Sequence, residues 1–267
     1  MSIRLSLRQA PDLRLDLRGL QPGLREVAAI ERLPLAQGRQ FVALAEFFSV
    51  AAVDDGQDGL LLEGDLSRCD RLGWQMDGGR IQVEGAIGDY AGAGMRAGEL
   101  RIHGNAGALA ACEMAGGSLV IDGNVGDFAA STLPGSMDGM RGGTLVVRGH
   151  AGARFGDRMR RGTVLVFGNT GDFLASRMVA GTIAVGGGCG AHAAYGMRRG
   201  TLVFAGSAPE PAPTFVPAGA EAPVFWQLLA RDLARHGGVF AGLAACRITR
   251  HLGDVAAGGK GEWIVTG

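Results

Sequence analysis

Residues 78–99, GGRIQVEGAIGDYAGAGMRAGE, decide the fold of this chain of 267 residues. Seven of these twenty-two positions are glycine, and only three carry branched aliphatic side chains. Because glycine loses the most entropy on folding, such a density serves tight turns, disorder or a close approach of two backbones. One glycine then returns every 19 residues with a single interval of 26, at Gly85, Gly104, Gly123, Gly149, Gly168, Gly187 and Gly206. This period predicts a repeat architecture with one insertion of seven residues.

Methionine follows the same period, with the same single long interval, at Met76, Met95, Met114, Met140, Met159, Met178 and Met197. Each unit begins with a short alternating run such as ELRIHG or TLVVRG, and a period of two predicts a half-buried strand. The first inward column of these strands contains Ile81, Leu100, Leu119, Leu145, Val164, Ile183 and Leu202. A further column of small or aliphatic residues contains Ile87, Ala106, Val125, Ala151, Thr170 and Cys189.

A single unit encloses no core, so the units must stack until their columns become continuous. We therefore predict an all-β fold, a right-handed parallel β-helix of about seven coils with 19 residues per coil. A calcium-binding roll is excluded because its repeated GGxGxD motif is missing. We divide the chain into an N-terminal cap region at 1–59, the parallel β-helix at 60–206 and a C-terminal extension at 207–267. The cap is expected to close the open end, because an uncovered terminal strand would pair with another chain.

The C-terminal extension begins with a proline-rich linker at 207–223, SAPEPAPTFVPAGAEAP. The sequence VFWQLLARDLARHGG that follows predicts a helix ended by two glycines. We expect one face of this helix to pack on the stack or on partners, and we place on it Phe225, Leu228, Leu229 and Leu233.

Composition limits the classes of partner. Hydrophobic residues make up 47% of the chain, and Lys+Arg and Asp+Glu both number 26, so overall charge favours neither nucleic acid nor an acidic membrane surface. The longest apolar run, 41–53, is interrupted by Glu46 and is too short to cross a bilayer. The first residues carry charges every few positions and do not read as a signal peptide, which predicts a cytoplasmic protein. The four cysteines have no C-x-x-C pair and are interpreted as reduced thiols.

No catalytic or metal-binding residue is predicted. The glycines of GAGMRAG and GGGCG recur in every unit with no helix after them, so they are interpreted as corners rather than nucleotide loops. The five histidines do not recur in one column and lack metal-ligand spacing, so they are interpreted as solvated or locally hydrogen-bonded. Cys189 occupies an inward column, which indicates packing rather than nucleophilic chemistry. Asp89, Asp127 and Asp172 share one corner phase and are predicted to cap turns.

The outward positions of the strands change character midway along the chain. Early units carry polar residues there, whereas later units carry Val146, Leu165, Phe167 and Val203. Such an apolar strip should not face water, so it predicts a cover, supplied by the tail of the chain or by another subunit. We name these four residues as a candidate apolar interface.

Arginines also line up in columns. Arg96, Arg141, Arg160 and Arg198 follow the methionines directly, Arg161 and Arg199 come next, and Arg158 and Arg177 precede a methionine. Stacked like charges repel unless they are solvated or matched. The alternatives are a solvated edge or contact with an anionic partner or an acidic ligand tail. The candidate contact residues are Arg141, Arg160, Arg161, Arg198 and Arg199.

The segments GNVGDF, PGSMDGMRGGTLVVRGHAG, GDRMRRGTVLVFGNTGDF, ASRMVAGTI and GMRRGTLV, with the tail RHLGDVAAGGKGEWIV, are similar to the C subunit of formylmethanofuran dehydrogenases and of bacterial formyltransferase/hydrolase complexes. The glycine repeat alone is shared with the C-terminal domain of the glutamate synthase large subunit. The resemblance covers residues 60–206 most strongly. It implies a β-helical subunit without catalytic residues that works beside three others: an amidohydrolase-like subunit that holds metal, a molybdopterin-oxidoreductase-like subunit and a formyltransferase subunit.

The resemblance implies a role in one-carbon metabolism. In the bacterial version, the complex releases formate from a formylated carrier of methanofuran type, and the Arg/Ala/Gly-rich composition favours that version. Such carriers bear glutamate tails, which gives the arginine columns a possible ligand. Two alternatives remain: the same subunit in a molybdenum or tungsten formylmethanofuran dehydrogenase, and a structural β-helix like that of glutamate synthase. A β-helical polysaccharide lyase is a further class, but it would need acids and bases clustered in one groove, which the sequence does not show.

Overall fold

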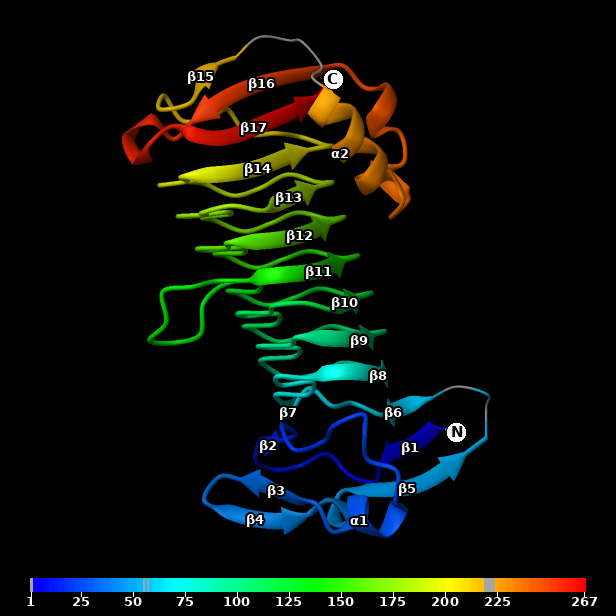
Figure 1. The fold of residues 1–267 in the computed structure, drawn as a ribbon. Helices are drawn as coiled ribbons and strands as arrows, with labels where there is room; N and C mark the ends of the chain where they lie inside the picture. The colour runs from blue at the N-terminus through cyan, green and yellow to red at the C-terminus, as the bar shows by residue number, and fades with distance from the viewer. Residues whose placement is uncertain (1, 55, 57, 219–223) are drawn as a thin grey trace.

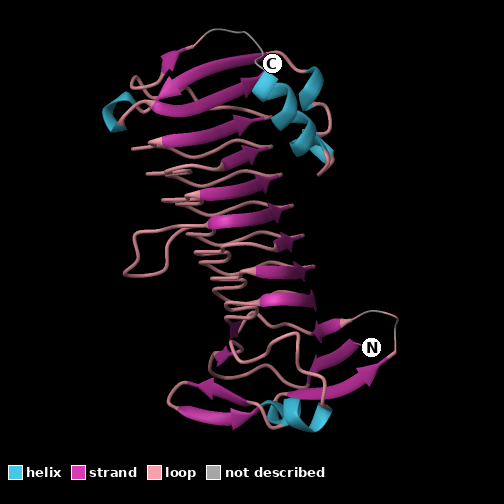
Figure 2. Ribbon diagram, in the orientation of Figure 1, coloured by secondary structure: helices cyan, strands magenta, loops and turns pink. Residues whose placement is uncertain are grey.

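The computed structural model describes residues 2–54, 56, 58–218 and 224–267, so the last five residues of the predicted linker, 219–223, lie outside the described part. The chain is mostly β, and its strands stack along a long axis with short helical segments at the two ends (Figure 1, Figure 2). The repeated units supply parallel strands that neighbour one another in chain order: β6 (Gly59–Glu63), β8 (Asp77–Glu84), β9 (Ala97–Ile102), β10 (Ser118–Ile121), β11 (Arg141–Val147), β12 (Arg161–Val166), β13 (Thr182–Val185) and β14 (Arg199–Phe204).

Residues 19 apart lie side by side on neighbouring strands. Leu100 is in register with Ile81 on one side and with Leu119 on the other. Leu119 is in register with Leu145 across the interval of 26, so the inserted residues leave the stack, as the loop between β10 and β11 in Figure 1 shows. A second ladder of parallel bridges joins Leu66, Ile87, Ala106, Val125, Ala151, Thr170 and Cys189. The predicted columns are therefore confirmed.

The shared period of glycine and methionine has a steric cause. Gly98 has a φ of +90°, and a Cβ built on it would lie 2.5 Å from the Cε of Met76 and 2.6 Å from the carbonyl oxygen of Gly79. Gly162 repeats the arrangement with Met140. Each such glycine therefore leaves room for the methionine of the preceding unit, which is fully buried.

Polar side chains at the corners join each unit to the next. The Oδ1 atom of Asp89 accepts a hydrogen bond from the backbone N–H of Ala108, 19 residues further on. Asp127 and Asp172 accept equivalent bonds from the following units. The predicted caps are therefore hydrogen bonds between units rather than within one turn. A neighbouring corner column makes the same kind of bond through Asn105, Asn124, His150 and Asn169.

The N-terminal residues extend the stack at one end. β1 lies parallel to β6 and antiparallel to β5, which is the last strand of the long sheet. A second sheet of four strands has the order β4-β3-β2-β7, and α1 packs against β5. The bounds of these elements are β1 (Ser2–Leu7), β2 (Leu15–Asp16), α1 (Val27–Glu31), β3 (Pro34–Gln37), β4 (Gln40–Ala43), η1 (Leu44–Glu46), β5 (Phe48–Val53) and β7 (Cys69–Asp70).

The C-terminal residues extend the other end and then fold back along the stack. β17 lies parallel to β14, β16 turns back antiparallel to β17, and β15 pairs with the outer side of β16. The bounds are β15 (Val216–Pro217), α2 (Val224–Ala234), η2 (Gly238–Phe240), η3 (Leu243–Ala245), β16 (Ile248–Gly253), η4 (Val255–Ala257) and β17 (Lys260–Thr266).

The apolar strip is covered by the chain itself. Val146, Leu165 and Val203 are buried in one cluster with Trp226 and Leu233 of α2. Phe167 lies edge to face with Phe240 of η2, at 4.9 Å between ring centroids. Of the two covers that the sequence allowed, the structure shows the tail: it buries Val146, Leu165 and Val203 and packs against Phe167.

The predicted packing face of the helix is confirmed at Leu229 and Leu233, which pack against the strip, and corrected at Phe225 and Leu228. α2 buries Trp226, Ala230 and Leu233, whereas Phe225 is 44% exposed and Leu228 is 62% exposed. The first two turns of α2 carry apolar side chains nearly all round, so periodicity alone does not determine which side packs inward. The largest side chain, the indole of Trp226, fills the space over the strip.

Candidate functional site: an arginine edge

The predicted arginines gather along one edge of the stack, beside the inserted loop. Arg141, Arg161 and Arg199 begin strands β11, β12 and β14, and Arg160 and Arg198 precede two of them. The side chains are exposed because they follow the turn that carries each buried methionine. We use the term arginine edge for these five residues together with Arg158 and Arg177, which the sequence placed in a column but not in the candidate set.

Two adjoining depressions run along the arginine edge. One, of about 640 Å³, is lined by Arg158, Arg160, Arg177 and Arg198, and Met137 of the inserted loop and Ala256 of η4 also line it. The other, of about 430 Å³, is lined by Arg141, Arg160, Arg161 and Arg199. Arg160 and Val179 line both. The structure therefore brings all five predicted arginines to one continuous surface.

A buried carboxylate organises part of the edge. The side chain of Asp157 is 5% exposed, and its Oδ1 and Oδ2 atoms accept hydrogen bonds from Nη2 of Arg177 at 2.9 and 2.8 Å. The Nε atom of Arg158 lies 3.8 Å from the same carboxylate. A bidentate pair of this kind fixes a guanidinium in one orientation. Asp157 was not predicted from the sequence, although its position two residues before Met159 places it beside the arginine columns.

The remaining arginines differ in how they are paired. Arg160 contacts Asp138 of the inserted loop at 2.6 Å, and Arg141 lies 3.6 Å from Glu113. Within the described residues, no carboxylate lies within 4 Å of Arg161, Arg198 or Arg199. Guanidinium groups bind carboxylates through two parallel hydrogen bonds. The arginine edge therefore presents guanidinium groups that can bind carboxylates along its length.

A second cluster of charges lies on the outer face of β8–β10. The Nδ1 atom of His103 lies 2.8 Å from Oδ2 of Asp122, and its Nε2 atom lies 3.6 Å from Oε1 of Glu84. Arg101 also contacts Asp122, and the side-chain amide of Gln82 bonds to Glu84. His103 is thus locally hydrogen-bonded. Its partners were not predicted from the sequence, although the 19-residue register places Glu84 and Asp122 on either side of it.

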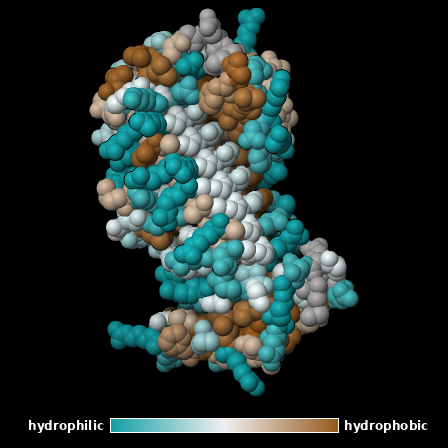
Figure 3. All heavy atoms as spheres, in the orientation of Figure 1, coloured by the Kyte–Doolittle hydropathy of each residue, from teal (hydrophilic) through white to brown (hydrophobic). Residues whose placement is uncertain are grey.

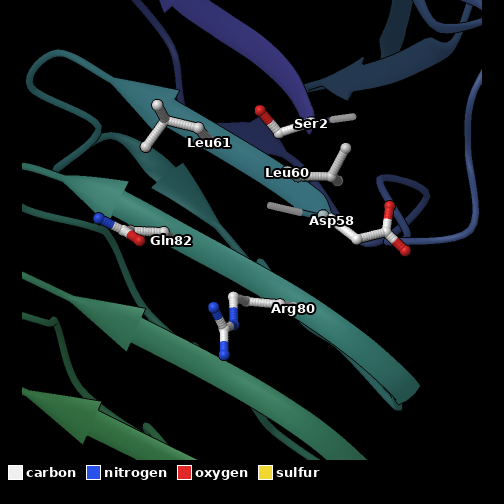
Figure 4. A pocket seen from close by; sticks show the side chains of 7 residues that line it. Ser2, Asp58, Leu60, Leu61, Arg80 and Gln82 are labelled. Carbon is white, nitrogen blue, oxygen red and sulfur yellow. The ribbon is translucent and has the colours of Figure 1, made fainter. Parts of the chain in front are cut away.

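The thiols and the smaller cavity offer little chemistry. Burial raises the pKa of Cys112 to about 12 and that of Cys189 to about 11, which keeps both protonated at neutral pH. A cavity of about 80 Å³ lies between the ends of β6 and β8, near Ser2, Arg80 and Gln82 (Figure 4). It is smaller than the usual ligand pocket of about 300 Å³ or more. In the described residues, no group of three or more His, Cys, Asp or Glu could hold a metal ion.

None of the described helices is both long enough and apolar enough to span a membrane. No protein-family model matches the chain. Over almost its whole length, however, the chain is similar to one chain of a solved structure, the crystal structure of the formyltransferase/hydrolase complex from Methylorubrum extorquens in complex with methylofuran. The identity is 41% and the TM-score is 0.91, with 99% of each chain covered.

Curated relatives match over shorter segments. The C subunit of the formyltransferase/hydrolase complex of Methylorubrum extorquens is 43% identical over 89 residues, 31% of this chain and 32% of the relative. The C subunit of the tungsten-containing formylmethanofuran dehydrogenase 2 of Methanothermobacter marburgensis is 30% identical over 98 residues, 34% of this chain and 36% of the relative. The matched segments thus span about a third of the length of these curated relatives.

The fold defines a class of β protein that is built as one long, mainly parallel stack of strands. Within that class, the chain belongs to the family of C subunits found in formyltransferase/hydrolase complexes and formylmethanofuran dehydrogenases.

Proposed function

We propose that this chain is the non-catalytic scaffold subunit of a cytoplasmic formyltransferase/hydrolase complex, which releases formate from a formylated carrier of methanofuran type. The observation that carries the proposal is the match over 99% of both chains to a component of such a complex. The dehydrogenase alternative rests on a lower identity, 30% against 43% over segments of similar length. In this proposal the catalytic metal belongs to other subunits, as the resemblance to these C subunits implies.

The stack supports the proposed scaffold role. We infer that residues 60–206 form a right-handed parallel β-helix of about seven coils, with a cap at 1–59 and a packing extension at 207–267. Two parallel ladders that advance together by 19 residues per step support this geometry. Rows of buried side chains make such a stack stiff, and a stiff rod presents surfaces at fixed spacing to several partners.

The arginine edge is the surface that we assign to an acidic ligand tail or an anionic partner. Three of its arginines have no carboxylate within 4 Å in the described residues, and Arg177 is held in place by Asp157. Unpaired guanidinium groups repel one another across neighbouring strands, so a ligand with repeated carboxylates would relieve that repulsion and bind. Glutamate tails of the carrier have this chemistry.

Assembly tests the proposed function. We would co-express the chain with the three expected partners, namely the amidohydrolase-like, the molybdopterin-oxidoreductase-like and the formyltransferase subunits, and purify through a tag on one of them. Co-elution of this chain in a fixed ratio, with formate released from a formylated carrier, is expected. A complex that forms and works without this chain would contradict the proposal. Molybdenum or tungsten in the purified complex would favour the dehydrogenase alternative.

Charge reversal tests the arginine edge. Arg160→Glu with Arg199→Glu should weaken the retention of an oligoglutamate probe by at least about tenfold, because two cations become anions on one surface. Arg39→Glu is the matched control, since Arg39 is an exposed arginine on the hairpin at the opposite end of the molecule. Equal retention by the double variant and the control would remove the ligand role from the arginine edge.

A further inference from the structure

The tail helix α2 presents a second apolar surface on its outer side. Val224 is 78% exposed, Leu228 is 62% exposed and Phe225 is 44% exposed. Val224 and Leu228 are four residues apart, so they form one stripe opposite the buried face of Trp226, Ala230 and Leu233. Figure 3 shows hydrophobic side chains gathered at this end of the molecule, over α2. We call Val224, Phe225 and Leu228 the outer stripe.

Beyond the outer stripe, the exposed side of α2 becomes cationic toward the end of the helix. Arg231 continues this side of α2, and Arg235 follows the end of the helix, with Asp232 between them in the sequence. Arg235 pairs with Asp232 at 3.3 Å, whereas no carboxylate lies within 4 Å of Arg231 among the described residues. The outer side of α2 is thus apolar in its first two turns and positively charged in its last.

We propose that this outer side of α2 docks into a groove of a different subunit, apolar at one end and bearing a carboxylate opposite Arg231 at the other. Helices with apolar side chains at a spacing of three or four residues bind in such grooves. The charge distribution disfavours a second copy of the chain as the occupant. A two-fold antiparallel pairing of α2 would set the arginines of one copy against the apolar residues of the other, and a parallel pairing would oppose arginine to arginine.

This inference rests on the proposed function, because it needs a complex of unlike subunits. It also explains why the tail carries apolar residues all round. The inner side of α2 covers the apolar strip at Leu165 and Val203. The outer side of α2 forms the proposed interface with the partner subunit, so this interface lies on the tail rather than on the strip itself. The tail would then join the stack to the partner.

The test uses the assembled complex. The chain is co-expressed with the same three partner subunits, and dissociation is followed by dilution in mass photometry. Val224→Ser with Leu228→Ser should weaken binding of this chain by at least about tenfold, and Arg231→Glu by about fivefold. Phe41→Ser is the matched control: Phe41 is a 76% exposed phenylalanine on β4, at the far end of the molecule, and its change should leave binding within about twofold. The melting temperatures of the isolated variants check that each remains folded.

The outcomes distinguish a failure of the proposed function from a failure of the docking inference. If the wild-type chain never joins the complex, the proposed function fails and this inference fails with it. If the wild-type chain assembles and the Val224/Leu228 variant assembles equally well, only the docking inference is overturned. If the isolated wild-type chain forms a dimer that the same variant abolishes, the outer stripe is a self-association surface and the inference is wrong. Loss of assembly in the variant, but not in the control, supports it.

Discussion

The two halves of the outer face of the long sheet share one backbone geometry and differ in what covers them. In the open half, β8 and β9 carry Gln82 and Arg101 outward, and these side chains pair with Glu84 and with Asp122, which follows β10. In the covered half, β11–β14 carry Val146, Leu165 and Val203 outward, beneath α2. Inside the stack, both halves repeat the same buried columns. The inward residues therefore fix the stack, and the outward residues decide where a second layer is added.

The largest expected effect separates the two halves directly. Leu165→Ala should lower the free energy of unfolding by about 2–5 kcal/mol, because it opens a cavity between β12 and the tail. Gln82→Ala in the open half should change it by less than about 0.5 kcal/mol. Chemical denaturation of both variants measures the contrast, and equal losses would mean that the tail does not protect the covered half.

The next effect concerns the geometry that both halves share. Gly98→Ala should cost about 1–3 kcal/mol, because the new Cβ meets the Gly79 carbonyl oxygen and the backbone has a positive φ. Gly78→Ala is the control, since a Cβ there meets no atom within 4 Å. Thermal unfolding compares the two. A Gly98 variant as stable as the control would show that the close contact between units is not required.

The boundary between the halves gives a smaller effect. The Nη1 atom of Arg148 donates a hydrogen bond to the carbonyl oxygen of His236 at 3.2 Å, and its guanidinium lies 4.4 Å from the centroid of the Phe167 ring. Arg148→Ala should therefore cost about 1 kcal/mol and raise amide hydrogen exchange in α2. Arg101→Ala, in the open half, should leave exchange in α2 unchanged. Unaltered protection of α2 in both variants would remove Arg148 from the attachment of the tail.

The smallest effect is a pH dependence confined to the covered half. Burial lowers the pKa of His236, with Arg148 acting in the same direction and Asp232 against it. As the pH falls, His236 therefore takes up a proton in the unfolded chain before it does so in the folded chain. Its contribution to the free energy of unfolding is complete above pH 6.5 and is lost as the pH falls below that value. His236→Gln should have a flatter stability profile between about pH 7.5 and pH 5. Parallel profiles for the two proteins would contradict the assignment.

The sequence predicted the stack well because each unit contributes one residue to every column. Leu100, Leu119 and Leu145 could be aligned by counting, and the interval of 26 located the insertion. The same spacing of 19 residues also identifies the neighbours of His103, which are Glu84 and Asp122. Because the strand register repeats every 19 residues, contacts that depend on the register can be predicted from the sequence.

The sequence could not predict the packing of segments that occur only once in the chain. The tail occurs once, and its helix is apolar nearly all round, so the choice of Trp226 over Phe225 as the inward residue depends on the shape of the strip beneath it. The columns of arginines were predicted from the sequence, but the way in which their side chains pair with carboxylates was not. The pairing of Arg177 with Asp157 depends on side-chain directions at a turn with positive φ, which a column of residue names does not specify.

Disulfide trapping tests the central claim, that residues 19 apart are nearest neighbours on adjacent strands, most directly. Gln82 and Arg101 are in register on β8 and β9. Gln82→Cys with Arg101→Cys should therefore form a bond within the chain under mild oxidation, because adjacent strands lie about 4.8 Å apart. Gln82→Cys with Val120→Cys spans two strand spacings and should not bond. Efficient trapping of the second pair, or none of the first, would contradict the stack and the scaffold role built on it.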